Sequence, residues 1–234
     1  MRIRDTIVAA ALLSTAMAAF GAREACAQTS LAAPPTPARD GTLGTISTVT
    51  MVLGAATVSL MPRVYYSSPE STVGWKARWH FSVLAPAMTL TALTLLVDIP
   101  IKDALKSPRP GCGVDQTLYP LSTCASYGSP STHAFASWGS TGSGLGVFLV
   151  DTFKYSGSRF NAGSFVGNVA VPLTLSVITS VGRGVAPGSS FAYESPTSVV
   201  AGTLSGFVTG ALLGTAYAFL QRPDCGYGND VLCW

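Results

Sequence analysis

Two cations are the first residues of this chain whose types and spacing indicate chemistry. Lys102 and Arg109 are seven positions apart, which is about two helical turns, so both side chains can lie on one face. A lysine offers a point charge and an arginine a planar fork of donors, and together they match a phosphate group. Pro108 and Pro110 are expected to end this helix where Arg109 must project. The pair therefore predicts a phosphate-binding element.

A second candidate element stands directly before an apolar run, at Pro130-Ser131-Thr132-His133. Ser131 or Thr132 can cap a helix that starts here, which leaves backbone N–H groups at the positive end of the helix dipole. Such a terminus binds phosphate readily. His133 would lie beside it and could donate a proton to a leaving alkoxide.

The composition favours a membrane protein as the setting for these elements. Of the 234 residues, 48% are apolar and only 11% are charged, whereas charged residues make up about 25% of ordinary soluble proteins. A compact helical periplasmic protein is the alternative. The net charge of +3 is spread along the chain without a basic run, so nucleic acid is not an expected partner.

Five apolar segments are expected to be helices, each near the length of about 17–25 residues that spans a bilayer. The third is rich in Gly and Ser, which suits a helix packed closely among others. The fourth is short and contains Pro172. We therefore predict an all-α, multi-helix bundle. The segments run over Leu43–Met61, Phe81–Ile99, Ala134–Val150, Val166–Val181 and Val199–Leu220.

The N-terminus is typical of an export signal. Arg2 and Arg4 precede an apolar stretch, and Ala25-Cys26-Ala27 offers a cleavage site, with a retained N-terminal anchor as the alternative. The expected organisation is a signal peptide or anchor at 1–27, a flexible leader at 28–42, a helical domain at 43–220 and a Cys-containing tail at 221–234.

Four cysteines beyond the signal form two close pairs in the sequence, which suits disulfides in an oxidising compartment. Three connectivities are possible, and neighbour pairing is the simplest. A metal site is not expected, because no histidine or further cysteine is spaced to complete one. The expected pairs are Cys112 with Cys124 and Cys225 with Cys233.

Cations also predict an orientation in the membrane. If residue 43 begins outside, the loop with Arg63, Lys76 and Arg78 and the loop with Lys154 and Arg159 both lie in the cytoplasm, in line with the positive-inside tendency. All the phosphate-binding candidates then share the periplasmic face. The same count places the C-terminal tail in the cytoplasm, where a disulfide is not expected.

The order of these motifs resembles the type 2 phosphatidic acid phosphatase family, which is similar to bacterial class A acid phosphatases and vanadium haloperoxidases. The family pattern is Lys, six residues, Arg-Pro; then Pro-Ser-Gly-His; then Ser-Arg, five residues, His, three residues, Asp. Here the first stretch matches fully, the second matches except at Thr132, and Arg183 follows about fifty residues later. The resemblance covers roughly residues 80–220.

The resemblance implies a helical bundle of that kind, with its site facing the periplasm. His133 would be the general acid, and neither a cofactor nor a metal is required. The residues implied to hold the phosphate are Lys102, Arg109, Arg183, Ser131 and the backbone around Thr132.

The third stretch departs from the family. Gly182 stands where the family has serine, and alignment of the following segment puts Glu194 in the place of the nucleophilic histidine and Ser198 in that of the aspartate. Covalent catalysis needs an attacking atom. Attack by Glu194, attack by His133 and direct activation of water are the alternatives for an active enzyme.

The sequence therefore predicts a phosphatase-like protein of a bacterial inner membrane. Its expected partners are lipid-linked or small phosphate esters, with binding better retained than hydrolysis, so that turnover is weakened or lost. A non-catalytic protein that binds phosphate or lipid head groups, or acts as a scaffold, is the alternative function, and a soluble periplasmic protein is the alternative location.

Overall fold

The computed structural model describes residues 41–66, 74–78, 84–110, 112, 126–185 and 192–223. The predicted export signal, most of the leader and most of the Cys-containing tail lie outside these residues. Cys124, Cys225 and Cys233 do so as well, and the disulfide pairing therefore stays a prediction.

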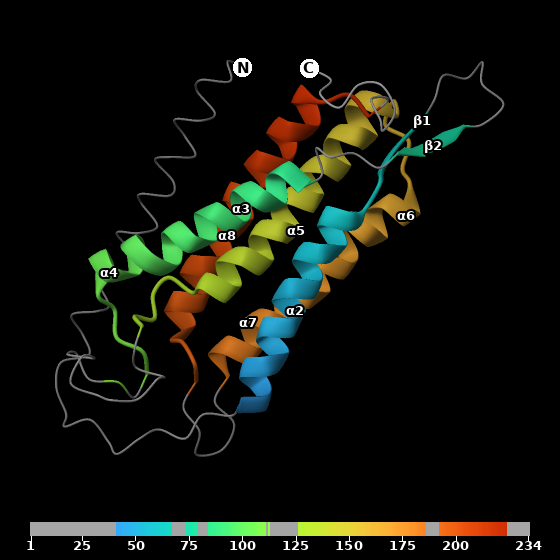
Figure 1. Ribbon diagram of the computed structural model, residues 1–234. Helices are drawn as coiled ribbons and strands as arrows, with labels where there is room; N and C mark the ends of the chain where they lie inside the picture. Colours follow the sequence, from blue (N-terminus) through green and yellow to red (C-terminus); the bar gives the residue numbers. More distant parts are fainter. Residues whose placement is uncertain are drawn as a thin grey trace.

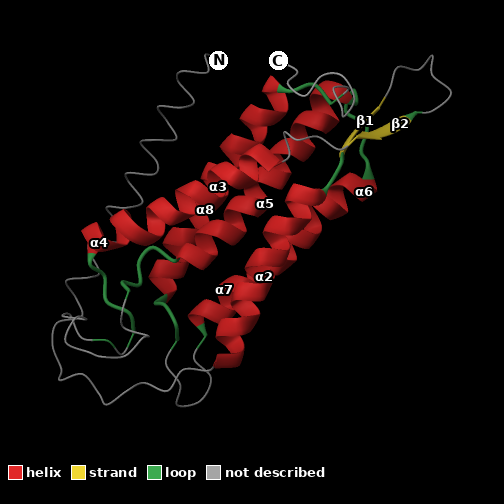
Figure 2. Cartoon of the chain, viewed as in Figure 1, coloured by secondary structure: helices red, strands yellow, loops and turns green. Residues whose placement is uncertain are grey.

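The described chain is a bundle of helices with one small hairpin (Figure 2), which confirms the all-α prediction. The helices are α2 (Gly41–Leu60), α3 (Leu84–Leu96), α4 (Lys102–Leu105), α5 (Thr132–Val150), α6 (Ala162–Phe165), α7 (Val171–Gly184) and α8 (Pro196–Leu220). π-helical turns at Val97–Ile101, Asp151–Tyr155 and Val166–Ala170 join or extend them. Strands β1 (Arg63–Tyr66) and β2 (Trp75–Arg78) pair antiparallel, with Arg63 opposite Arg78.

Four helical stretches of the described chain are long and apolar enough to cross a membrane: Gly41–Leu60, Leu84–Leu105, Ala162–Gly184 and Pro196–Leu220. Helix α5 is not among them. It lies among the other helices (Figure 1) and buries thirteen of its nineteen residues. This confirms the prediction that the Gly- and Ser-rich segment is packed inside the bundle. Large apolar side chains such as Val52 on α2 and Met88 on α3 are more than half exposed, as expected for lipid-facing positions.

Helices α5 and α8 run parallel and touch along their backbones. Glycines recur every four residues along α8, and a Cβ added at any of them would lie closer than van der Waals contact to the backbone of α5. Their counterparts on α5 also recur every four residues, so the two helices stay in register over about three turns. The four glycines and their α5 counterparts are Gly202 with Ser131, Gly206 with Phe135, Gly210 with Gly139, and Gly214 with Ser143.

Buried hydroxyl pairs join the other helices inside the bundle. Thr50 on α2 and Thr179 on α7 lie 2.8 Å apart between their hydroxyl oxygens, and Thr141 on α5 and Ser176 on α7 lie 2.8 Å apart. Such contacts are expected between close-packed helices, where a polar atom facing lipid would have no partner. They fix the rotation of α7 against both of its neighbours.

A buried ion pair holds the hairpin to the end of the bundle. Arg63 on β1 forms a doubly hydrogen-bonded pair with Asp151 just after α5, and both side chains are nearly inaccessible. The same guanidinium donates to the Gln221 carbonyl at 2.6 Å and to the Ala218 carbonyl at 3.3 Å. Arg63 therefore also caps the C-terminus of α8, where a cation is favoured by the helix dipole.

The bundle has two distinct ends (Figure 1). The hairpin, α6 and the C-termini of α5 and α8 lie at one end, and α4, the N-termini of α5 and α8 and the C-terminus of α7 lie at the other. The predicted phosphate-binding residues therefore share the second end, and the cations of the hairpin and of the segment after α5 share the first.

The α5–α8 contact predicts that Gly210→Ala destabilises the bundle. The new methyl group meets the Gly139 backbone, which cannot move aside, and overpacking of this kind costs about 1–3 kcal/mol or more. Gly54→Ala on α2 is the matched control, because its Cβ would lie 3.7 Å from Leu175, an ordinary contact. There, the higher helix propensity of alanine, up to about 1 kcal/mol, should keep or raise stability. Thermal unfolding in mild detergent measures both, and equal effects contradict the prediction.

The Arg63–Asp151 pair predicts a strongly non-additive mutant cycle. Arg63→Met leaves the Asp151 carboxylate buried without its partner, which costs about 3–5 kcal/mol. Adding Asp151→Asn should recover part of that loss, because the unpaired charge is then gone. Unfolding of the two single variants and the double variant in detergent gives the coupling energy. Additive losses would show that the pair is not coupled.

Candidate functional site

Lys102 begins helix α4 directly after a π-helical turn that contains Pro100. Its side chain is 2% exposed, and its Nζ donates to Asp98 Oδ1 at 2.9 Å. The Thr132 hydroxyl donates to the same oxygen at 2.7 Å. Asp98 therefore bridges the lysine and the start of α5. Sequence reasoning missed Asp98, although an acid four residues before a lysine on a helix is a known pairing signal.

Arg109 follows the end of α4, as the prolines beside it predict, and is half-buried. Its Nε donates to the Ser126 carbonyl at 2.9 Å and its Nη2 to the Ser126 hydroxyl at 2.8 Å. Gly128 lies against the Arg109 side chain and donates its N–H to the Ser107 carbonyl at 2.8 Å. These bonds hold the arginine against the segment that leads into α5.

Ser131 is the N-cap of α5, which settles the choice between Ser131 and Thr132. Its hydroxyl accepts from the Ala134 N–H at 3.2 Å, and its own N–H donates to the Ser198 carbonyl at 2.9 Å. The second bond ties the N-termini of α5 and α8 together. Two helix dipoles therefore present their positive ends at the same place.

His133 stands one residue inside α5 and is half-buried. Its Nε2 lies 3.2 Å from the hydroxyl oxygen of Thr48 on α2. Thr48 was not predicted, and no sequence signal links it to the motif, since the two residues are 85 positions apart. The contact can hold the imidazole in one orientation, which a proton donor needs.

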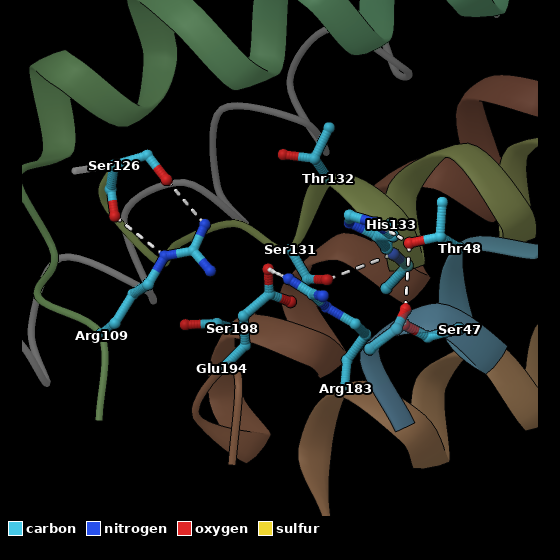
Figure 3. A network of polar contacts seen from close by, with 12 residues as sticks. Ser47, Thr48, Arg109, Ser126, Ser131, Thr132, His133, Arg183, Glu194 and Ser198 are labelled. Carbon is cyan, nitrogen blue, oxygen red and sulfur yellow. Dashed lines mark hydrogen bonds and ion pairs between the residues drawn. The ribbon is translucent and has the colours of Figure 1, made fainter. Parts of the chain in front are cut away.

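Arg183 and Glu194 form a second buried ion pair, at 3.1 Å between Nη2 and Oε1 (Figure 3). Glu194 is fully buried, and its N–H donates to the Arg183 carbonyl at 3.1 Å. The guanidinium also lies 4.6 Å from the centre of the Tyr193 ring. Among the residues that the structure describes, neither Arg183 Nε nor Glu194 Oε2 has a hydrogen-bond partner.

Several positive charges act on the Glu194 carboxylate. Burial alone would raise its pKa, but the Arg183 guanidinium, the Ser131 hydroxyl and the charges of Arg109 and Lys102 together hold that pKa below its ordinary value of 4.5. Glu194 is therefore an anion at neutral pH. In the view of Figure 3 it stands between Arg109 and Arg183.

All seven predicted site residues lie at this end of the bundle: Lys102, Arg109, Ser131, Thr132, His133, Arg183 and Glu194. His80 lies outside the described residues. Three cations and the two carboxylates of Asp98 and Glu194 leave one excess positive charge, apart from His133. The cluster can thus accept an anion, and among the described residues no three His, Cys, Asp or Glu side chains are close enough to hold a metal ion.

Local packing and capping account for Gly182 and Ser198, two positions at which the sequence differs from the pattern it resembles. A Cβ at Gly182 would lie 3.1 Å from Ser47 Cβ and 3.2 Å from the Leu43 carbonyl, so α2 comes too close for a larger residue without adjustment. The Ser198 hydroxyl lies 2.7 Å from the Ser195 hydroxyl, which caps α8 by accepting from the Ser198 N–H. Ser198 therefore helps to start α8.

Comparison with known proteins adds no assignment. The sequence matches no protein-family model, and neither a curated protein nor a solved structure is significantly similar to it. The functional argument therefore rests on the geometry of this cluster.

The Arg183–Glu194 pair predicts a stability difference that depends on pH. Because the pKa of Glu194 is lower in the folded than in the unfolded chain, its contribution is present above about pH 4.5 and is lost as the pH falls through the folded pKa. Wild type should thus exceed Glu194→Gln in stability at pH 6, and the gap should shrink as the pH falls below 4.5. Unfolding in detergent across this range measures the gap, and a constant gap contradicts the prediction.

Proposed function

We propose that this cluster binds the phosphate group of a lipid-linked or small phosphate ester. The observation that carries the proposal is the convergence of three cations from distant parts of the chain on the capped start of α5. Lys102 and Arg109 come from α4 and its end, and Arg183 comes from the last turn of α7. Guanidinium and ammonium groups next to two helix N-termini are the donors that phosphate prefers.

Binding is favoured over turnover in this proposal. His133 is placed to protonate a leaving alkoxide, but burial and then the charge of Arg183 lower its pKa to about 4, so the imidazole is mostly neutral near pH 7. The nucleophile's place holds Glu194, whose Oε1 is bound to Arg183. In this proposal the Arg183 guanidinium should hold the phosphate, but it already binds the Glu194 carboxylate. The carboxylate and the phosphate would compete for the same donors, so Glu194 is poorly placed to attack the phosphorus atom. The protein is therefore proposed as a phosphatase-like binder of the type 2 phosphatidic acid phosphatase kind, with hydrolysis weakened or lost.

The distribution of charge supports a membrane orientation. Cations on β1, on β2 and after α5 lie at the end opposite the cluster, and the described helices long enough to span a bilayer connect the two ends. With positive residues inside, the cluster would open to the periplasm of a bacterial inner membrane. A lipid-linked phosphate would then approach from the outer leaflet.

The proposal predicts that inorganic phosphate and vanadate stabilise the protein in detergent between pH 5 and 7. Arg109→Gln should weaken this effect by about tenfold in affinity, because it removes one of the positive charges that act on the site. Lys76→Gln is the matched control, since it removes an exposed cation at the other end of the bundle. The shift of the unfolding midpoint with ligand concentration measures both variants.

Phosphate release from a lipid phosphate and from an aryl phosphate tests the catalytic part. Any true turnover should fall by roughly a hundredfold or more in His133→Ala, because the general acid is lost. No turnover, with phosphate still stabilising the fold, is the result expected of a binder. No stabilisation by either anion, or equal losses in Arg109→Gln and Lys76→Gln, contradicts the proposal.

A further inference from the structure

Two buried ion pairs in the described part of the chain differ in how many of their donor and acceptor atoms have hydrogen-bond partners. At the hairpin end, Arg63 uses Nε and Nη2 on Asp151 and gives further bonds to two carbonyls of α8. At the cluster, Arg183 uses only Nη2 on one oxygen of Glu194. A buried structural pair is expected to satisfy all of its donors and acceptors, because each unpaired atom costs free energy. The second pair is thus built differently.

The unsatisfied atoms lie on both partners of the second pair. Arg183 Nε is a donor and Glu194 Oε2 an acceptor, both are buried, and neither has a hydrogen-bond partner among the described residues. A ligand that offers two acceptor oxygens side by side could accept hydrogen bonds from Arg183 Nε and Nη2 at the same time. A tetrahedral phosphate is such a group, and planar two-point binding is the geometry that a guanidinium prefers.

A phosphate on Arg183 would meet the Glu194 carboxylate at close range. The two negative charges disfavour each other, so a bound phosphate favours the neutral form of the Glu194 carboxyl group. The groups that face Glu194 are Arg183 on α7, Ser131 and His133 on α5, and the cations Arg109 and Lys102. The three cations already carry their protons, so of these groups only His133 and Glu194 can take one up, and only at Glu194 does the proton remove a negative charge beside the phosphate.

We propose that Glu194 is a built-in counter-anion of the phosphate site, and that a phosphate group binds Arg183 together with one proton taken up by the Glu194 carboxylate. This inference rests on the proposed function and adds its regulation. The proton comes from solvent and forms the O–H bond of the carboxylic acid, which can then donate to a phosphate oxygen. Affinity for phosphate therefore rises as the pH falls.

The direction follows from linkage. In the empty protein the pKa of Glu194 lies below 4.5, and a phosphate beside it raises that pKa, because a second negative charge disfavours the ionised form. At a pH between the pKa of Glu194 without phosphate and its pKa with phosphate bound, binding takes up a proton. In this range, each unit by which the pH falls strengthens binding by up to about tenfold. A site of this type holds its ligand in acid and releases it near neutrality.

Glu194→Gln tests the inference, because the amide keeps the shape of the neutral side chain. The full-length protein in detergent is titrated with inorganic phosphate at several pH values from 5 to 7.5. We expect Glu194→Gln to bind about tenfold or more tightly than wild type at pH 7, with the ratio of affinities shrinking as the pH falls. The ratio of the two affinities at each pH is compared because the ionisation of phosphate itself affects wild type and Glu194→Gln equally.

Asp103→Asn is the matched control for net charge. Asp103 is an exposed acid on α4, so its removal changes the total charge by the same amount without touching Arg183. We expect less than about a twofold change in affinity, since exposed charges are screened. An equal gain in Asp103→Asn and Glu194→Gln overturns the inference, because charge alone would then explain it.

Calorimetry of wild type keeps the test independent of the variant's folding. Phosphate binding at pH 5.5 in buffers of different ionisation enthalpy gives the number of protons taken up, and we expect a value approaching one. Binding without proton uptake, and with equal affinity in Glu194→Gln, overturns the inference and leaves the proposed function standing. No phosphate binding by wild type or by Glu194→Gln overturns the proposed function itself.

Discussion

The parallel contact between α5 and α8 is the constraint on which the rest of the structure depends. Their backbones touch because glycine recurs every four residues on α8 and the backbone of α5 lies against each of these glycines. The contact keeps the two helices in register, so their N-termini meet and the Ser131 N–H reaches the Ser198 carbonyl. This bond between the two helix N-termini positions the cluster residues on α5 and those just before α8. A bundle with bulkier residues here would separate His133 from the Arg183–Glu194 pair.

Few residues of this protein are charged, and two of its buried ion pairs differ in how they are hydrogen-bonded. At the hairpin end, Arg63 and Asp151 satisfy each other and cap α8, as a purely structural pair should. At the opposite end, Arg183 and Glu194 leave a donor and an acceptor without a partner among the residues that the structure describes. Both pairs are buried to a similar degree, so burial alone does not separate structure from function. The completeness of their hydrogen bonding does.

The proposed phosphate site contains its own carboxylate and therefore differs chemically from one with a histidine in that place. The carboxylate neutralises part of the cradle's positive charge, which lowers the cost of keeping three cations together in an empty, partly buried site. It also competes with the ligand for Arg183. Glu194, which stands where the family pattern has the nucleophilic histidine, thus stabilises the cluster of cations. The one remaining excess positive charge favours the binding of an anion.

The sequence by itself determined the helical class, the packed position of the Gly- and Ser-rich segment, and the seven residues that meet at one end. The first two follow from hydrophobic length and small-residue content, and five of the seven residues follow from cations or caps at helix ends. Arg183 and Glu194 were selected only by the order of motifs that the chain shares with the family it resembles. Tertiary structure alone decided the roles of Asp98 and Thr48, the need for glycine at 182, and the pairing of Arg183 with Glu194. Those depend on which helices touch and at what rotation, and the close contacts that set them join residues far apart in the chain, where no local pattern records the distance.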